Sequence, residues 1–312
     1  MTRTTAPVEA DQYLLNGFVP FPDERVERYR QAGYWMGKPL DRLLADAAQQ
    51  WPDRVAVTDP SASYTFARLD QLASEAAAGF AALGIGIGDR VLLQLPNTAN
   101  FAVALFGLLR TGAVPVMCLP AHRRAELSHF AQVSGAVALV IADRFGGFDY
   151  RDMARELAAE HPTLRQVIVD GDAGEFTTWT SLFGQAPVPR PLVDTATPAL
   201  LLVSGGTTGA PKLIPRTHDD YYYNATASAE LCEMTGDDVY LAVLPAAHNF
   251  PLACPGLLGA MSVGATTVFT TDPSPESAFA TIAQHGVTVC ALVPALASLW
   301  TLACDWEPQR PT

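Results

Sequence analysis

The sequence predicts an α/β fold built from two doubly wound, mainly parallel sheets. Short apolar runs alternate along the chain with segments in which apolar residues recur at helical spacing. The runs are continuously apolar, as expected for strands of a parallel sheet that helices cover on both faces. The chain has 312 residues, 49% of them hydrophobic, which is enough to form more than one core.

The predicted elements follow one another in a regular order. Strands are predicted at the apolar runs Val55–Thr58, Tyr64–Phe66, Val91–Leu95, Ala113–Leu119, Val137–Ile141, Gln166–Val169, Ala199–Val203, Val239–Leu244, Ala265–Phe269 and Val287–Val293. Helices are predicted, where apolar residues share one helical face, from Pro39 or Leu40 to Gln50 and at Phe66–Leu83, Thr98–Arg110, Glu126–Ser134, Tyr150–Glu160, His218–Cys232, Leu252–Met261, Glu276–Gln284 and Ala295–Leu302.

Composition divides the chain into three parts. Residues 1–38 are rich in proline, arginine and aromatic residues and are predicted to be an irregular N-terminal segment. Residues 39–190 are predicted to form a first α/β subdomain. Prolines cluster between residues 186 and 198, which marks this stretch as an internal boundary. Residues 191–312 are predicted to form a second, incomplete α/β subdomain.

Charge and cysteine usage exclude several classes of partner. The net charge of −12 disfavours nucleic acid or an anionic membrane as a partner. The five cysteines show no C-x-x-C spacing, so we expect reduced thiols, without a zinc site or a disulfide framework. The N-terminus lacks the apolar stretch of a signal peptide, and no segment has the apolar length of a membrane span. A cytoplasmic location is expected.

A loop rich in glycine, serine and threonine follows the strand at residues 199–203. Its sequence over residues 204–212 is S-G-G-T-T-G-A-P-K. Glycines let the backbone approach a ligand closely, and successive backbone N–H groups in such a turn form a concave anion site. Hydroxyl donors and one lysine complete a predicted phosphate site, which consists of Ser204, Gly205, Gly206, Thr207, Thr208, Gly209 and Lys212.

This loop differs from the P-loop of nucleoside triphosphatases, which requires G-x-x-x-x-G-K-[ST]. Ala210 and Pro211 separate Gly209 from Lys212. Leu213 stands where the P-loop has the hydroxyl that binds Mg²⁺. A Walker-type site is therefore excluded.

The stretch S-G-G-T-T-G-A-P-K-L-I-P-R-T-H-D-D-Y resembles the signature loop of the adenylate-forming enzymes. More narrowly, it is similar to the stand-alone aryl-acid AMP ligases of siderophore pathways. The segment Phe21–Trp35 and two apolar motifs, at residues 64–69 and 108–115, resemble the same group. The resemblance covers the whole chain but only the front part of the family. It implies that the C-terminal barrel, the mobile domain and the residues for magnesium, ribose and the catalytic lysine are absent, so no metal ligand is predicted.

The stretch Leu244–Gly256 follows a predicted strand and leads into a helix, a usual position for a ligand site in an open α/β sheet. The resemblance implies that these residues form the acid pocket. In that arrangement His248 lies at the mouth, where the carboxylate meets the α-phosphate, and Asn249 reaches the pocket floor. Phe250 covers the aromatic ring, and Cys254 faces the far edge of the ring.

Two of these residues bear on the substrate. An α-amino acid would bring a desolvated ammonium group that needs a carboxylate, whereas the neutral Asn249 suits a phenolic hydroxyl ortho to the carboxylate. Cys254 is a weak donor, so it favours a ring edge without a second hydroxyl, as in salicylate, over 2,3-dihydroxybenzoate. The alternatives are an asparagine that caps a turn and a buried structural thiol.

The remaining candidates carry less chemistry. His218 is expected to have a structural role, such as capping the helix that follows, and Arg216 could hold the loop or its phosphates. The run Tyr221–Tyr223 is interpreted as helix packing. The other histidines without metal-ligand partners are His122, His129, His161 and His285. No serine lies in a G-x-S-x-G motif, so a hydrolase triad has no support.

Together these features predict an enzyme that uses ATP and Mg²⁺ to activate an aryl carboxylic acid, with salicylate favoured, as the aryl-adenylate. The resemblance implies transfer to the phosphopantetheine thiol of an aryl carrier protein, with His248 and Lys212 as catalytic candidates. Three alternatives stay open: 2,3-dihydroxybenzoate as the substrate, an aryl- or acyl-CoA ligase, and a ligand-binding piece without catalysis. The 312 residues alone are expected to be poorly active in adenylation.

Overall fold

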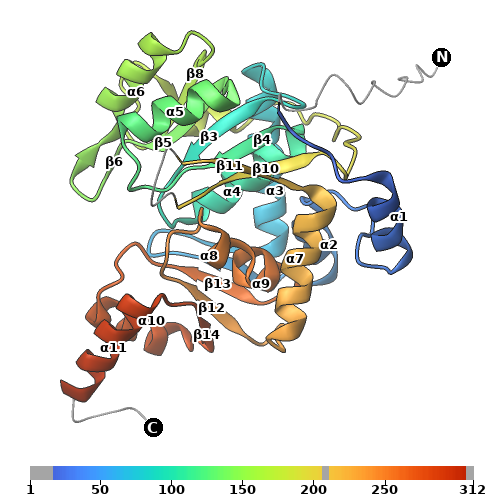
Figure 1. Cartoon of the computed structure of the whole chain (residues 1–312). Coiled ribbons are helices and arrows are strands. Elements are labelled where there is room, and N and C mark those ends of the chain that lie inside the picture. Colours follow the sequence, from blue (N-terminus) through green and yellow to red (C-terminus); the bar gives the residue numbers. More distant parts are fainter. Residues whose placement is uncertain (1–16, 206–210, 307–312) are drawn as a thin grey trace.

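A computed structural model describes residues 17–205 and 211–306. Two sheets lie one above the other in Figure 1, with helices between them and on their outer faces. Helices α3 (Phe66–Ala82) and α4 (Ala99–Thr111) occupy the middle layer, where α4 contacts both β4 and β1. The predicted α/β class with two mainly parallel sheets is confirmed, and the described residues form no closed barrel.

The larger sheet has seven strands in the order β11-β10-β4-β3-β5-β8-β9 and is parallel except for the β10–β11 pair. Its strands are β3 (Arg90–Gln94), β4 (Val114–Met117), β5 (Ala138–Ala142), β8 (Gln166–Asp170), β9 (Thr177–Thr178), β10 (Pro198–Val203) and β11 (Leu213–Thr217). Helices α5 (Arg124–Ser134) and α6 (Tyr150–Glu160) cover its outer face. Leu92 faces this outer core while its neighbours Val91 and Leu93 face the central core, which explains the continuously apolar strands.

The smaller sheet has five strands in the order β14-β12-β13-β1-β2. Its strands are β1 (Val55–Thr58), β2 (Ser63–Thr65), β12 (Val239–Ala242), β13 (Thr266–Phe269) and β14 (Val289–Cys290). Its helices are α2 (Arg42–Gln50), α7 (His218–Leu231), α8 (Asn249–Ala253), α9 (Gly256–Val263), α10 (Pro275–His285) and α11 (Pro294–Trp306). Helices α2, α7, α8 and α9 pack into the central core, and α10 and α11 cover the opposite face.

The two sheets do not follow the predicted boundary between residues 190 and 191. Strand β10, expected to open the second subdomain, pairs with β4 of the larger sheet, with Leu201 opposite Val116. Strand β1, expected in the first subdomain, pairs with β13, with Val57 opposite Thr267. An apolar strand of either sheet looks the same in sequence, so its pattern does not tell which neighbour it pairs with.

Two local predictions need correction. The segment at residues 1–38, expected to be irregular, contains helix α1 (Asp23–Gln31), which has acidic residues in its first turn and basic residues in its last. That charge arrangement favours a helix, but no residue of α1 is buried, so there is no apolar periodicity to detect. The helix predicted at Leu252–Met261 is two helices, α8 and α9, because Pro255 lacks an N–H and Gly256 takes a φ of 57°.

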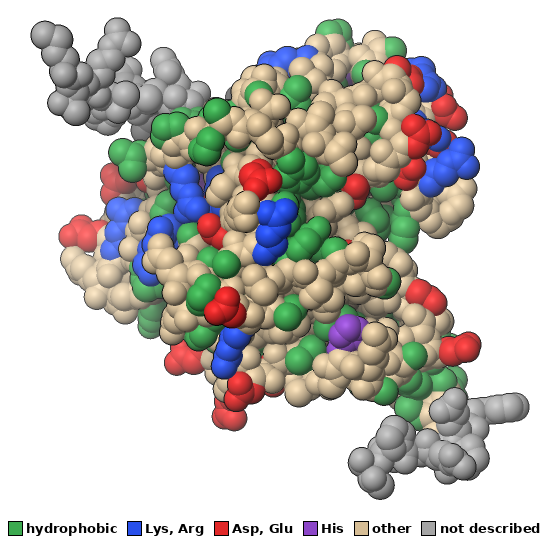
Figure 2. Space-filling model, turned by 180° about the vertical axis from the view of Figure 1, so that it is seen from behind, with side chains coloured by type: hydrophobic (Ala, Val, Ile, Leu, Met, Phe, Trp, Pro, Cys, Tyr) green, Lys and Arg blue, Asp and Glu red, His purple; other side chains and the backbone are tan. Residues whose placement is uncertain are grey.

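Strand β11 was not predicted, because it contains Pro215 and proline is rare inside strands. The hairpin β6 (Arg144–Phe145) and β7 (Phe148–Asp149), strand β9 and the 3₁₀ turn Trp179–Leu182 were also too short for a periodic signal. None of the helices in the described ranges has the length and apolar character needed to cross a membrane. Seen from behind, acidic and basic side chains are interspersed over the surface (Figure 2).

Candidate functional site

The predicted phosphate loop joins the antiparallel strands β10 and β11. Its base is closed by two reciprocal hydrogen bonds: the Ser204 N–H donates to the Lys212 carbonyl at 2.9 Å, and the Lys212 N–H donates to Ser204 Oγ at 2.8 Å. Gly205 and Lys212 are exposed beside this base. Gly206, Thr207, Thr208 and Gly209 lie outside the described residues. A loop between two strands differs from the strand–loop–helix of a Walker site, in agreement with the exclusion from sequence.

A histidine from α5 holds the end of this loop. His129 Nε2 lies 2.9 Å from the carbonyl oxygen of Pro211. Because a carbonyl can only accept, the imidazole donates, and Nε2 carries the hydrogen. The sequence assigned His129 no role, since its partner lies 82 positions further along the chain.

The residues after the loop have structural partners. Arg216 forms an ion pair with Asp220, with Nη2 2.6 Å from Oδ1, and its guanidinium lies 4.6 Å from the centre of the Tyr221 ring. Thr217 caps α7 by accepting from the Asp220 N–H. His218 is buried, and its Nδ1 accepts from the Leu40 N–H at 3.0 Å. The structural role predicted for His218 is confirmed, while the capping role belongs to Thr217.

The acid-pocket stretch begins where β12 ends. His248 is the N-cap of α8, and its Nδ1 accepts from the Phe250 N–H at 3.3 Å. In the neutral ring the hydrogen is therefore on Nε2. The His248 side chain is exposed, so this N–H is available to an anionic ligand. Phe250, next along the chain, is 37% exposed.

Asn249 and Cys254 lie together on the side of α8 that faces α7. Asn249 Nδ2 is 3.5 Å from Cys254 Sγ, and its Oδ1 accepts from the Tyr221 hydroxyl at 3.1 Å. Asn224 donates to the Ala253 carbonyl at 2.7 Å and lies 3.6 Å from the same sulfur. Helices α7 and α8 contact each other, and both pack against α9, which lies between them in the view of Figure 1.

Tyr221, interpreted from the sequence as helix packing, and Asn224 were not predicted to belong to this cluster. Their spacing could have indicated them, because residues three apart share one face of a helix and both side chains can form hydrogen bonds. That face could not be assigned to a partner before the position of α8 was known.

A buried asparagine connects the acid-pocket loop to the larger sheet. Asn97, which follows β3, donates from Nδ2 to the carbonyl oxygens of Ala242 and Leu244 at 2.8 Å each. Its Oδ1 accepts from the Ala246 N–H at 2.7 Å. Every bond reaches the segment just before His248, so Asn97 holds this segment against the end of the larger sheet. Its role was also missed, since its partners are about 145 residues away.

Comparison with known proteins assigns this arrangement to a family. The family model described as AMP-binding enzyme matches residues 44–309, which is most of the chain. The chain belongs to the AMP-binding enzyme family. The predicted membership of the adenylate-forming enzymes is therefore confirmed.

Relatives of this AMP-binding chain act on aryl acids. It is 66% identical over 304 residues to a salicyl-AMP ligase / salicyl-S-ArCP synthetase of Mycobacterium tuberculosis, covering 95% of this chain and 54% of that protein. It is 45% identical to the 2,3-dihydroxybenzoate-AMP ligase of Bacillus subtilis, covering 92% of this chain and 53% of that protein. The apo structure of MbtA from Mycobacterium smegmatis matches with a TM-score of 0.88 and 68% identity, over 92% of this chain and 54% of that one. The chain thus spans about half the length of these relatives.

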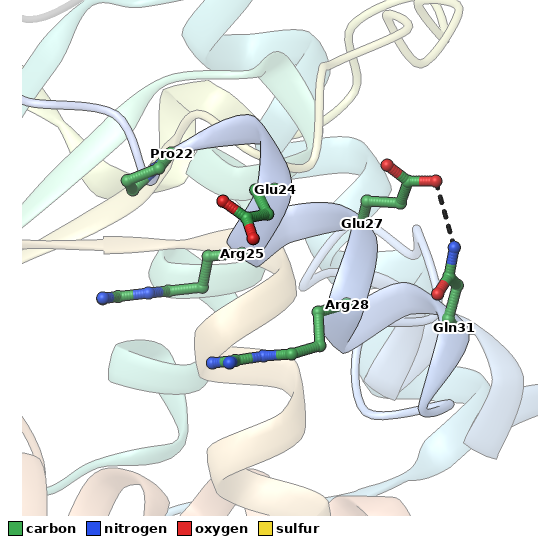
Figure 3. A pocket seen from close by; sticks show the side chains of 6 residues that line it. All are labelled: Pro22, Glu24, Arg25, Glu27, Arg28 and Gln31. Carbon is green, nitrogen blue, oxygen red and sulfur yellow. Dashed lines mark hydrogen bonds between the residues drawn. The ribbon is translucent and has the colours of Figure 1, made fainter.

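The AMP-binding chain has further surface hollows. One cavity, of about 470 Å³, is formed by side chains of α1 and the residue before it, and Arg25 and Arg28 extend side by side along it (Figure 3). Its residues are Pro22, Glu24, Arg25, Glu27, Arg28 and Gln31. All of these side chains are exposed, so this hollow lacks the buried polar groups of a binding site.

A second hollow, of about 310 Å³, lies where strands of both sheets end. Its lining includes Asn97, Arg123, Tyr150, Pro245 and Thr270. Since ligands of open α/β sheets bind beyond the carboxyl ends of strands, this hollow and the acid-pocket loop occupy the expected edge. Among residues 17–205 and 211–306 no three His, Cys, Asp or Glu side chains are grouped so as to hold a metal ion.

Replacing Asn97 by alanine is expected to lower the free energy of unfolding by about 2 kcal/mol, because three buried hydrogen bonds are lost and their backbone partners stay desolvated. Urea unfolding of the purified chain measures the change. The matched variant Gln49→Ala removes an exposed amide on α2 and should leave stability nearly unchanged. Equal stability of both variants would contradict the role given to Asn97.

Stability is expected to depend on pH through His218. Burial lowers the pKa of His218 from 6.5 to about 4. The unfolded chain therefore binds more protons than the folded chain between these two pH values. The stability that His218 contributes is fully present above pH 6.5 and is lost as the pH falls toward 4. His218→Asn, whose Oδ1 can still accept from Leu40, should remove about 2 kcal/mol of the stability difference between pH 7 and pH 5. The measurement is urea unfolding of the wild type and His218→Asn at pH 7 and pH 5. An equal loss of stability between the two pH values in both proteins would refute the role given to His218.

Proposed function

We propose that this chain provides the acid pocket and the phosphate loop of an enzyme that activates salicylate with ATP and transfers the salicyl group to an aryl carrier protein. The observation that supports this most strongly is the cluster of Asn249 and Cys254 next to the exposed His248, whose Nδ1 accepts from the Phe250 N–H. It offers the amide of Asn249 at one end and the Nε2–H donor of His248 at the other, which matches a phenol and a carboxylate on one ring. The names of the two aryl-acid ligases given above support the same substrate class.

In the proposed reaction a carboxylate oxygen of salicylate attacks the α-phosphorus of ATP. The new oxygen–phosphorus bond forms as the bond to the bridging oxygen of the β-phosphate breaks, and pyrophosphate leaves. No proton has to move, so the residues act by position and charge. His248 Nε2–H would donate to the carboxylate and hold it in line. Ser204, Gly205 and Lys212, at the base of the loop, would hold the β- and γ-phosphates.

The described residues do not fit a complete magnesium site, since they contain no suitable group of three ligands. Mg²⁺ is proposed as a cofactor of the reaction as a whole, without ligands from these residues, and the steps assigned to the chain do not depend on it. The carrier protein as acceptor is supported by the name salicyl-S-ArCP synthetase of the M. tuberculosis relative. ATP as a substrate favours the cytoplasm as the location.

The choice between salicylate and 2,3-dihydroxybenzoate is proposed to depend on Cys254. Its sulfur receives the amide groups of Asn249 and Asn224 at 3.5 and 3.6 Å, and a thiol is a weak partner for a further ring hydroxyl. Cys254→Ser should shift the affinity ratio toward 2,3-dihydroxybenzoate by about 3- to 10-fold, because the serine hydroxyl is a stronger donor and acceptor. Titration calorimetry with both acids measures the ratio. Cys232→Ser, at an exposed position, serves as the control. An unchanged affinity ratio in Cys254→Ser would exclude a contact between residue 254 and the edge of the substrate ring.

The proposed function is tested by exchange of labelled pyrophosphate into ATP, measured on the full natural protein that contains this chain. Exchange should require salicylate, and salicyl transfer should be faster to an aryl carrier protein than to coenzyme A. Turnover of ATP that is independent of any aryl acid would overturn the proposal. Faster transfer to coenzyme A would favour a CoA ligase instead.

A further inference from the structure

The hydroxyl of Tyr221 fixes the orientation of the Asn249 amide. Tyr221 is fully buried on α7, and its hydroxyl lies 3.1 Å from Asn249 Oδ1. The other end of the amide, Nδ2, points to Cys254 Sγ at 3.5 Å. Both ends of the amide therefore have assigned partners, one strong and one weak.

The reverse orientation of the amide is disfavoured. It would place Nδ2 against the Tyr221 oxygen and leave the buried O–H of Tyr221 without an acceptor, which is costly in a desolvated site. Burial raises the pKa of Tyr221, so the phenol keeps its proton and acts as the donor. The contact with Cys254 is weak in either orientation, because a thiol is both a weak donor and a weak acceptor, so the strong bond to Tyr221 decides the orientation.

This orientation decides what Asn249 can offer to a ligand. Oδ1 is occupied by Tyr221, so the group left for a substrate is the NH₂, which can only donate. Its present contact with a thiol sulfur is weak, so a ligand oxygen can replace it at little cost. In salicylate the phenolic hydrogen bonds to the neighbouring carboxylate, which leaves lone pairs of the phenolic oxygen to accept from Asn249. An aryl acid with an amine in the same ortho position would direct an N–H donor at the NH₂ of Asn249, which is itself a donor.

We propose that Tyr221 is a positioning residue that makes Asn249 a hydrogen-bond donor, so that the pocket selects an aryl acid with an ortho oxygen over one with an ortho amine. This inference rests on the proposed function, because it assumes that an aryl acid occupies the pocket. Tyr221 itself touches no substrate. Without its hydroxyl, the amide can turn and present Oδ1 to an ortho N–H.

The test compares salicylate and anthranilate, which differ only in the ortho group. Their affinities for the full natural protein are measured by titration calorimetry for the wild type, Tyr221→Phe and Tyr240→Phe. Tyr240→Phe is a matched control, since Tyr240 is also fully buried and its hydroxyl has no hydrogen-bond partner among the described residues. We expect the wild type to prefer salicylate by at least about tenfold, and Tyr221→Phe to reduce this preference by at least about fivefold. Tyr240→Phe should leave the preference unchanged. An unchanged preference in a folded Tyr221→Phe variant would overturn the inference.

A second measurement needs no substrate. In the chain labelled with ¹⁵N-asparagine, the side-chain NH₂ signals of Asn249 should shift or broaden in Tyr221→Phe, because the amide loses its fixed orientation. The same signals should keep their positions in Tyr240→Phe. If the wild-type protein binds neither acid, the proposed function fails. The orientation of Asn249 is then judged by the NH₂ signals alone, and unchanged signals in Tyr221→Phe would refute it.

Discussion

Replacing Asn249 by aspartate is expected to weaken salicylate binding at least about 100-fold, which corresponds to about 2.7 kcal/mol. The two side chains have the same shape, and one carboxylate oxygen can still accept from Tyr221. The other oxygen replaces the donating NH₂, so two acceptors face each other where the phenol binds. The new charge also repels the salicylate carboxylate in a partly desolvated pocket.

Titration calorimetry of wild type and variant measures this loss. Gln185→Glu is the matched control, since it introduces the same charge at an exposed position outside the acid pocket, and it should change the affinity less than twofold. Equal affinities of wild type and Asn249→Asp would show that the phenol does not bind at Asn249.

Replacing Arg110 by methionine is expected to destabilise the chain by about 3–5 kcal/mol. The Arg110 side chain is 1% exposed and pairs with Asp70 of α3, while its Nε lies 3.8 Å from the buried Asp41 at the start of α2. It also donates to Ser74 Oγ at 2.8 Å. Without it, both carboxylates still lie near Arg190, whose Nη1 is 3.3 Å from Asp41, but they lose their buried partner.

The loss is measured by urea unfolding. Arg155→Met is the control, because Arg155 also pairs with two carboxylates, those of Asp152 and Glu175, but on the surface of the molecule. Water screens that cluster, so the unfolding midpoint should stay nearly the same. Similar midpoint shifts for the two variants would show that burial does not govern the Arg110 cluster.

Sequence predicted the elements of this fold better than their pairing. The helix at Tyr150–Glu160 has the predicted bounds, and most strands lie within one or two residues of the apolar runs. Their continuous apolarity reflects burial on both faces, which is a local property. Strands β1 and β10 each pair in the sheet opposite to the predicted one. This pairing depends on contacts between distant segments, such as Val57 with Thr267, and the sequence of the strand itself does not indicate it. Helix α1 has no buried face, so its sequence lacks the periodic signal.

For the candidate site, the sequence located the segments but not the residues that support them. The loop at 204–212 and the stretch at 244–256 carry recognisable patterns of glycine, hydroxyl and polar residues. Tyr221 reaches the second stretch through one hydrogen bond to Asn249, and Asn97 holds the start of that stretch through three hydrogen bonds from another element. A buried tyrosine on a helix and an asparagine after a strand are common, so their roles could be found only from the positions of their partners.

The most direct test of the acid pocket is a crystal structure of the full natural protein with a non-hydrolysable mimic of salicyl-adenylate. We expect the phenolic oxygen to lie about 3 Å from Asn249 Nδ2, as in an ordinary hydrogen bond, with the acyl linkage beside His248 Nε2. We also expect Oδ1 of Asn249 still to accept from Tyr221. An aromatic ring bound in another hollow, or with its hydroxyl directed away from Asn249, would show that Asn249 does not bind the phenol.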